Sequence, residues 1–263
     1  MDLAVNGTTS YAYTGGKRFD PALPTVVFIH GAQHDHSVWI LQSRYLAHHG
    51  FGVLAVDLPG HGRSSGPALG SVEAMADWLI ALLGAAGVTR ASLVGHSMGS
   101  LIAIETASRS PDRVARIAMV GTAVPMRVGD ELLTATRDDE PGAIDMINIW
   151  SHSSYAQKPS NPGPGFWVVG QNKRLMERMD PGVLHADFAA CNAYANGLAA
   201  AATIKCPVLF ILGRRDAMTP LKAAAALRQA IPAATAVEVA ASGHALMAEA
   251  PDAVLEALRA FLR

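Results

Sequence analysis

Short apolar runs alternate with segments of helical period from residue 24 onward, and this alternation is the strongest constraint on the fold. The runs are almost continuously apolar, as expected for strands of a parallel sheet that is covered on both faces. We predict strands at 25–29, 52–56, 91–94, 117–120, 208–212 and 236–239. Helices are predicted at 36–49, 72–86, 98–108, 221–230 and 252–262. The chain is therefore expected to form an α/β domain in which helices flank a mostly parallel central sheet.

The alternation stops after residue 120. Residues 124–198 contain no strand-like run, and their Pro- and Gly-rich stretch at 159–165 is predicted to be a loop. Because a structureless connection of that length is uncommon in a compact domain, we expect a helical insertion, here called the cap segment. It would interrupt a core domain of residues 1–123 and 199–263. Its large apolar side chains are expected to pack on the core or line a pocket: Met126, Met146, Ile149, Trp150, Phe166, Trp167, Leu175, Met176, Met179 and Phe188.

Composition and charge exclude several classes of partner. With 21 basic and 22 acidic residues and a net charge of −1, the chain lacks the positive field that nucleic acids or anionic membranes attract. It also has neither a membrane-spanning apolar run nor a signal peptide, so we expect a cytoplasmic protein with a small-molecule substrate. Cys191 and Cys206 are expected to be free thiols. Homo-oligomers stay possible.

The chemistry is indicated most strongly by Gly95-His96-Ser97-Met98-Gly99, which lies between a predicted strand and a predicted helix. The pattern G-x-S-x-G in this context is typical of a sharp turn that exposes a serine hydroxyl at the carboxyl end of a sheet. The helix that begins there also favours negative charge nearby. We interpret Ser97 as a candidate nucleophile.

Through this motif the chain resembles the α/β-hydrolase family, from about residue 24 to its end. The resemblance implies a serine nucleophile, which is Ser97, followed along the chain by an acid and then a histidine. His244 follows the last predicted strand, where the catalytic histidine of the family lies. Asp216 follows the apolar run 208–212 and precedes His244 by 28 residues. We therefore expect a triad of Ser97, Asp216 and His244.

Acyl transfer also needs hydrogen-bond donors for the oxyanion. One expected donor is the backbone N–H of Met98, directly after the nucleophile. By resemblance to the His-Gly motif of the family, the second is Ala32 in His30-Gly31-Ala32-Gln33, and Gln33 is the alternative. No metal or organic cofactor is required by this chemistry.

A local excess of possible metal ligands is a competing feature. The residues concerned are His30, His34, Asp35, His36 and His61. They lack the helical His-Glu-x-x-His spacing, so we interpret them as surface or pocket residues and predict no metal site. In the loop 57–64 we expect a structural turn in which Asp57 and Arg63 pair.

We expect a serine esterase that forms an acyl-enzyme on a small, largely apolar carboxylic ester. Carbon-carbon bond hydrolysis and lactone hydrolysis could use the same triad, and a ligand-binding protein with low turnover is the alternative from another class. A carbon-carbon hydrolase would want a basic anchor for a substrate carboxylate. The cap segment offers five candidates for it: Arg127, Arg137, Lys173, Arg174 and Arg178.

Overall fold

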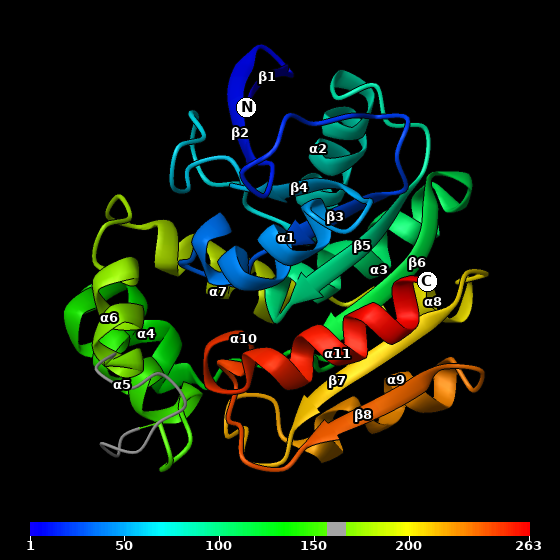
Figure 1. Cartoon of the computed structure of the whole chain (residues 1–263). Coiled ribbons are helices and arrows are strands. Elements are labelled where there is room, and N and C mark those ends of the chain that lie inside the picture. Colours follow the sequence, from blue (N-terminus) through cyan, green and yellow to red (C-terminus); the bar gives the residue numbers. More distant parts are fainter. Residues whose placement is uncertain (157–166) are drawn as a thin grey trace.

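The computed structural model describes residues 1–156 and 167–263, and a twisted sheet runs through its centre (Figure 1). Eight strands lie in the order β1-β2-β4-β3-β5-β6-β7-β8. Both pairs that involve β2 are antiparallel, and the remaining pairs are parallel. This confirms the predicted mostly parallel sheet. The strands are β1 (Asp2–Val5), β2 (Thr8–Tyr13), β3 (Thr25–Ile29), β4 (Gly52–Val56), β5 (Ala91–His96), β6 (Val114–Val120), β7 (Val208–Gly213) and β8 (Thr235–Val239).

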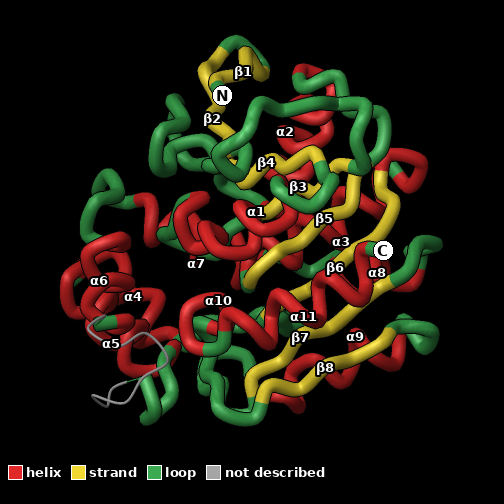
Figure 2. The backbone as a smooth tube through the Cα atoms, in the orientation of Figure 1, coloured by secondary structure: helices red, strands yellow, loops and turns green. Residues whose placement is uncertain are grey.

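Helices flank the sheet, and some of them gather beyond one end of its strands (Figure 2). Three short 3-10 helices are η1 (His36–Trp39), η2 (Pro111–Arg113) and η3 (Leu221–Ala224). The α-helices of the described residues are α1 (Ile40–Ala47), α2 (Val72–Ala85), α3 (Met98–Arg109), α4 (Asp130–Asp138), α5 (Glu140–Ser151), α6 (Val168–Met176), α7 (Val183–Ala193), α8 (Gly197–Ala202), α9 (Ala225–Ala230), α10 (Leu246–Glu249) and α11 (Pro251–Leu262).

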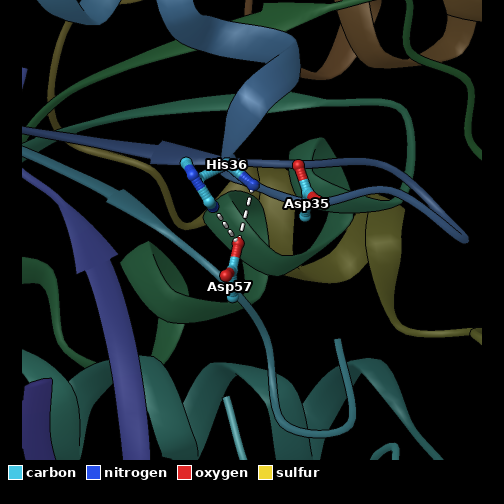
Figure 3. Close-up of side chains that lie close together, drawn as sticks. All are labelled: Asp35, His36 and Asp57. Carbon is cyan, nitrogen blue, oxygen red and sulfur yellow. Dashed lines mark hydrogen bonds and ion pairs between the residues drawn. The ribbon is translucent and has the colours of Figure 1, made fainter. Parts of the chain in front are cut away.

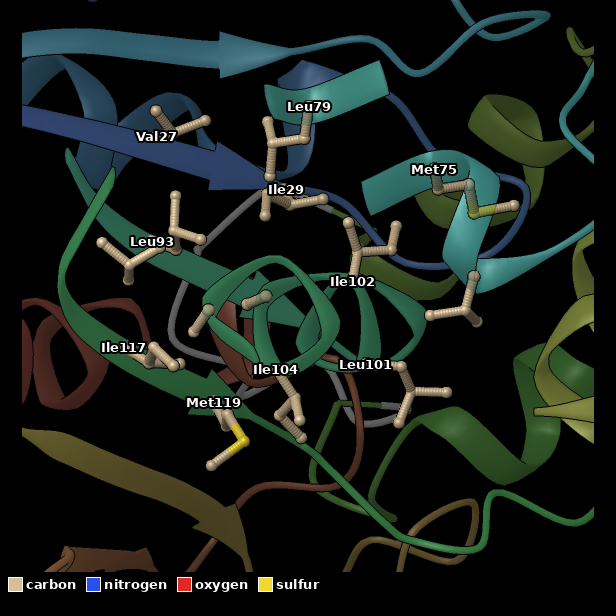
Figure 4. Packing of buried hydrophobic residues seen from close by; sticks show 14 of the residues in the cluster. Val27, Ile29, Met75, Leu79, Leu93, Leu101, Ile102, Ile104, Ile117 and Met119 are labelled. Carbon is tan, nitrogen blue, oxygen red and sulfur yellow. The ribbon is translucent and has the colours of Figure 1, made fainter. Parts of the chain in front are cut away.

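The core consists of two apolar layers, because successive strand residues point to opposite faces of the sheet. Val27, Ile29 and Leu93 pack with α2 and α3 on one face, as Figure 4 shows. Val26 and Phe28 pack with α1 and α11 on the other face. The strands are therefore rigid supports for the loops that follow their carboxyl ends.

Strand β8 differs from the prediction that each strand is covered on both faces. Its first four residues are exposed, because β8 forms the edge of the sheet and pairs only with β7. The expectation of burial is wrong for this strand.

The described residues of the cap segment contain no strand, as predicted. Helices α4, α5 and α6 form a group in Figure 1, while α7 also packs Ala190 and Cys191 in the core. A small apolar cluster joins these helices, with Leu132, Ile147 and Met176 among its members. The predicted loop 159–165 and Phe166 lie outside the described residues. Among the described helices, none has both the length and the apolar character needed to cross a membrane.

Candidate active site

Ser97 occupies the turn between β5 and α3. Its backbone has φ 51° and ψ −118°, which is a strained conformation for a residue with a side chain. The flanking glycines permit this turn. A Cβ on Gly95 would lie 2.1 Å from the carbonyl oxygen of Gly99, and a Cβ on Gly99 would lie 2.4 Å from that of Ile29. Both contacts are with backbone, so the G-x-S-x-G pattern follows from steric necessity.

His244 and Asp216 follow the adjacent strands β8 and β7, and their side chains meet. His244 Nδ1–H donates to Asp216 Oδ2 over 2.7 Å, and the two side chains are 8% and 1% exposed. The Thr219 hydroxyl donates to the same oxygen (2.7 Å), while the N–H groups of Met218 and Thr219 donate to Oδ1.

The hydrogen bonds around Asp216 decide its charge. Burial favours a raised pKa, but the facing His244 and the bonds from His244 and Thr219 outweigh it and lower the pKa to about 2. Asp216 is therefore an anion near neutral pH. Because it holds the Nδ1 proton of His244, Nε2 of the imidazole is left available as a base.

Two cavities meet at Ser97 and His244. The larger has a volume of about 590 Å³ and the smaller about 190 Å³. Five residues line both cavities: Ala32, Ser97, Phe188, Met218 and His244. Within the described part of the chain, Ser97 and His244 form no hydrogen bond with each other, but such bonds often tighten only when substrate binds. The structure thus brings all three residues of the predicted triad to one site.

Cap residues complete the lining of both cavities. Of the apolar set named from the sequence, Leu175 lines the larger cavity, Met126 and Trp150 line the smaller, and Phe188 lines both. Met176 is buried among the cap helices, whereas Trp167 is 72% exposed. Apolar character in the cap segment therefore marks three environments, of which the cavity wall is only one.

The two expected oxyanion donors lie beside the cavities. Met98 begins α3 next to Ser97, and Ala32 follows β3. Neither backbone N–H has an acceptor within the described residues. In contrast, the N–H of Gln33 already donates to Asp187 Oδ2 over 2.8 Å. The geometry therefore favours Ala32 over Gln33 as the second donor.

Cap side chains hold the peptide that joins Ala32 to Gln33. His34 Nδ1–H donates to the Ala32 carbonyl (2.6 Å), and Nε2 of the same ring contacts the Asn172 side-chain amide (2.8 Å to Oδ1). The N–H of this peptide is bound by Asp187 of α7, as described above. Gln33 itself is fully buried, with a positive φ of 57°. The cap helices α6 and α7 thus fix the loop that carries the Ala32 amide.

Asp187 also forms a buried pair with His61. Asp187 Oδ2 lies 2.9 Å from His61 Nε2, and both side chains are fully buried. His61 Nδ1 faces the Pro59 carbonyl at 3.0 Å, so both ring nitrogens face acceptors, which favours the protonated ring. Burial lowers the pKa of His61, but the charge and hydrogen bond of Asp187 outweigh this and raise the pKa above its usual value. The pair therefore links core and cap through a buried contact that becomes an ion pair when His61 is protonated.

Asp187 and Thr219 were not identified from the sequence. Thr219 carried a usable signal, because a hydroxyl three residues after an aspartate is typical of a capped turn. Asp187 carried a weaker one, as a single acidic residue in the apolar helix α7. Its partners Gln33 and His61 are 154 and 126 residues away in the sequence, so no local pattern connects them.

The histidine- and aspartate-rich loops contain a compact cluster of Asp35, His36 and Asp57 (Figure 3). Its hydrogen bonds come from the protein itself. Asp57 Oδ1 accepts from the N–H and Nδ1–H of His36, and Oδ2 accepts from the N–H of Arg63. Asp35 accepts from Arg178 and from the Ser37 N–H. These contacts join the loops after β3 and β4.

Asp57 and Arg63 pair as expected, but the pair does not involve the Arg63 side chain. Asp57 binds the backbone N–H of Arg63 over 2.9 Å. The guanidinium of Arg63 instead lies 3.7 Å from the ring centroid of Tyr11, where it makes a cation-π contact. The loop is therefore held by backbone as well as side-chain groups.

An elbow serine and a histidine-carboxylate pair at the carboxyl ends of parallel strands define the class of serine hydrolases. Comparison with known proteins agrees with this class. A family model described as alpha/beta hydrolase fold matches residues 24–251. The chain belongs to the α/β-hydrolase fold family, and it is a hydrolase.

Individual relatives cover most of the chain. The pimeloyl-acyl-carrier protein methyl ester esterase of Chromobacterium violaceum is 33% identical over 232 residues, which are 84% of this chain and 87% of the relative. The (E)-2-((N-methylformamido)methylene)succinate hydrolase of Acinetobacter baylyi is 25% identical and covers 90% of this chain and 89% of its own. The structure of the enol-lactonase from Burkholderia xenovorans LB400 matches with a TM-score of 0.87 and 27% identity, over 100% of this chain and 99% of that one.

Proposed function

We propose that the protein hydrolyses a small carboxylic ester through an acyl-enzyme on Ser97. The observation that carries this proposal is the placement of Ser97, on its strained turn, beside a His244 whose Nδ1 proton is bound by the Asp216 carboxylate. The 33% identical relative is named as an ester hydrolase, and the matching structure is named as a lactonase. Both names describe cleavage of a carboxyl C–O bond, which supports ester hydrolysis over carbon-carbon cleavage.

In the first half of the proposed reaction, His244 Nε2 takes the Ser97 hydroxyl proton while Oγ attacks the substrate carbonyl carbon. The resulting oxyanion accepts hydrogen bonds from the Ala32 and Met98 amides. The intermediate collapses, the bond to the alcohol oxygen breaks, and the alcohol leaves with the proton from His244. Asp216 stabilises the imidazolium that forms between these proton transfers.

In the second half, water replaces the alcohol. His244 takes a proton from water as its oxygen attacks the acyl carbon, and the Ser97 ester bond then breaks. Ser97 recovers its proton from His244 and the carboxylic acid leaves.

We propose that the cap segment forms a lid-like unit over this site. The proposed end of this unit near residue 198 is supported by α8 (Gly197–Ala202), which packs on α3 of the core. The cytoplasmic location stays a prediction from sequence.

A fluorophosphonate probe tests whether Ser97 is activated. We expect the protein to be labelled covalently, and Ser97→Ala to abolish the label, because only a serine beside a base attacks the probe quickly. Mass spectrometry of the labelled peptide measures the result. Ser154→Ala is the matched control, because Ser154 is exposed and outside both cavities. Equal labelling of the protein and Ser97→Ala would overturn the proposed nucleophile, and labelling without ester turnover would favour a binding protein.

Thr219→Val is expected to lower kcat for ester hydrolysis about tenfold, because a hydrogen bond to a charged group contributes roughly 1.5–3 kcal/mol. Valine keeps the shape of threonine but removes the hydroxyl that donates to Asp216 Oδ2. Steady-state kinetics at neutral pH measure the effect. Thr219→Ser retains the hydroxyl and should restore most of the lost rate. If the valine and serine variants have the same kcat, this bond does not orient the carboxylate.

A further inference from the structure

The smaller cavity carries a cation whose partner is missing from the fold. Arg127 lines this cavity together with Ser97 and His244. Its neighbours in the wall are mainly apolar, with Met126, Leu132, Trp150 and Phe188 among them, and no Asp or Glu of the described residues lines the cavity. Arg127 is exposed as well as lining the cavity, and it has no counter-charge among the described lining residues.

The other four basic candidates of the cap segment are already paired. Arg137 binds Asp138, Lys173 binds Asp145, Arg174 binds Glu177, and Arg178 binds Asp35. None of these four side chains lines either cavity. Within the described residues, Arg127 has neither an ion pair nor a hydrogen bond from its side chain. Among the five candidates, elimination therefore leaves Arg127 as the cation that is available to a bound molecule.

The larger cavity, in contrast, has no Arg, Lys, Asp or Glu among its described lining residues, and its walls include Leu41, Ile147 and Leu175. Its volume of about 590 Å³ is within the range of complete ligand pockets, roughly 300–1,000 Å³, whereas the smaller cavity of about 190 Å³ is below that range. An ester carbonyl at Ser97 has two substituents, which are the acyl chain and the alcohol group. The two cavities could each hold one of them, because they differ in size and in charge.

We propose that the substrate is an ester with one apolar arm, which fills the larger cavity, and one short arm that ends in a carboxylate, which binds Arg127 in the smaller cavity. This inference rests on the proposed ester hydrolysis at Ser97 and adds its substrate class. A guanidinium binds a carboxylate through two parallel hydrogen bonds, so Arg127 selects for this group by geometry as well as charge. Arg127 is then a specificity-determining residue.

Matched pairs of esters test the inference. In one pair, the p-nitrophenyl monoester of glutaric acid is compared with the neutral ester in which an isopropyl group replaces the terminal carboxylate. In the other pair, the carboxylate is on the alcohol arm. We expect kcat/KM to favour the acid in one of these pairs, and Arg127→Gln to reduce that preference about tenfold or more, because charged hydrogen bonds are lost. Most of the change should be in KM.

Two further variants separate local binding from general charge. Arg174→Gln removes the same charge from an exposed site, 84% accessible, outside both cavities, and should keep the preference. Arg127→Lys should restore part of it. The inference is overturned if the protein hydrolyses neutral esters without preferring an acid, or if both glutamine variants reduce the preference equally; ester hydrolysis itself then stands. Failure of all esters, together with no labelling of Ser97, overturns the proposed function and the inference together.

Discussion

Replacing Ser97 with alanine is expected to lower kcat for ester hydrolysis by about 10⁵- to 10⁶-fold, the size of loss known for nucleophiles that act as a unit with their base. The fold should persist, because alanine removes only the hydroxyl and Ser97 makes its bonds to the β6 carbonyl of Val120 and to Ser100 through backbone atoms. The residual rate is measured by steady-state kinetics. The enzyme is purified from a strain that lacks other esterases, so that contaminating activity does not mask the loss.

The strained turn supplies a control that uses stability rather than rate. Ser97→Gly should be about as inactive as Ser97→Ala but more stable by about 1 kcal/mol, because glycine adopts φ 51° and ψ −118° without the cost that a Cβ imposes. Chemical unfolding of both variants gives the difference. Residual activity above about one percent in either variant would contradict a nucleophilic role, given the expected loss. Equal stability of the two variants would contradict strain at the turn.

The triad positions could be predicted because they follow from strand topology. Ser97, Asp216 and His244 each follow a strand within five residues, and parallel strands place their carboxyl ends on the same side of the sheet. The structure brings these residues to one site, as expected, although their roles stay proposals. The glycines of the elbow were equally readable, since close backbone approach leaves no space for another residue at Gly95 or Gly99.

Features that depend on the relative placement of cap and core could not be predicted. The division of the site into two cavities arises from side chains of α5, α6 and α7 that face the loops after β3 and β7. The sequence offered five basic cap residues without distinguishing Arg127 from the four that pair with neighbouring carboxylates. The choice between Ala32 and Gln33 also depended on one distant side chain, Asp187, which occupies the Gln33 amide.

The dual contact of Asp187 leads to the second large effect. Asp187→Asn is expected to destabilise the protein by about 3–5 kcal/mol, because it leaves the buried His61 imidazolium without its counter-charge. It should also lower kcat about tenfold and change KM less. The reason is that Gln33 loses its anchor and the neighbouring Ala32 amide shifts, and one oxyanion donor contributes roughly 10²- to 10³-fold when fully lost. Unfolding curves and kinetics well below the melting temperature measure the two effects.

The pH dependence distinguishes this pair from ordinary packing. Since Asp187 raises the pKa of His61 in the folded protein, the pair stabilises the fold fully below the unfolded pKa of about 6.5, and this contribution is lost as pH rises through the folded pKa. The stability gap between the protein and Asp187→Asn should therefore be largest near pH 6 and smaller near pH 9. Asp180→Asn, at an exposed cap position, should show no such gap. A gap that is constant with pH would mean that Asp187 acts by packing alone, whereas a gap that closes with rising pH, together with a loss in kcat, identifies Asp187 as the residue through which the cap positions the oxyanion loop.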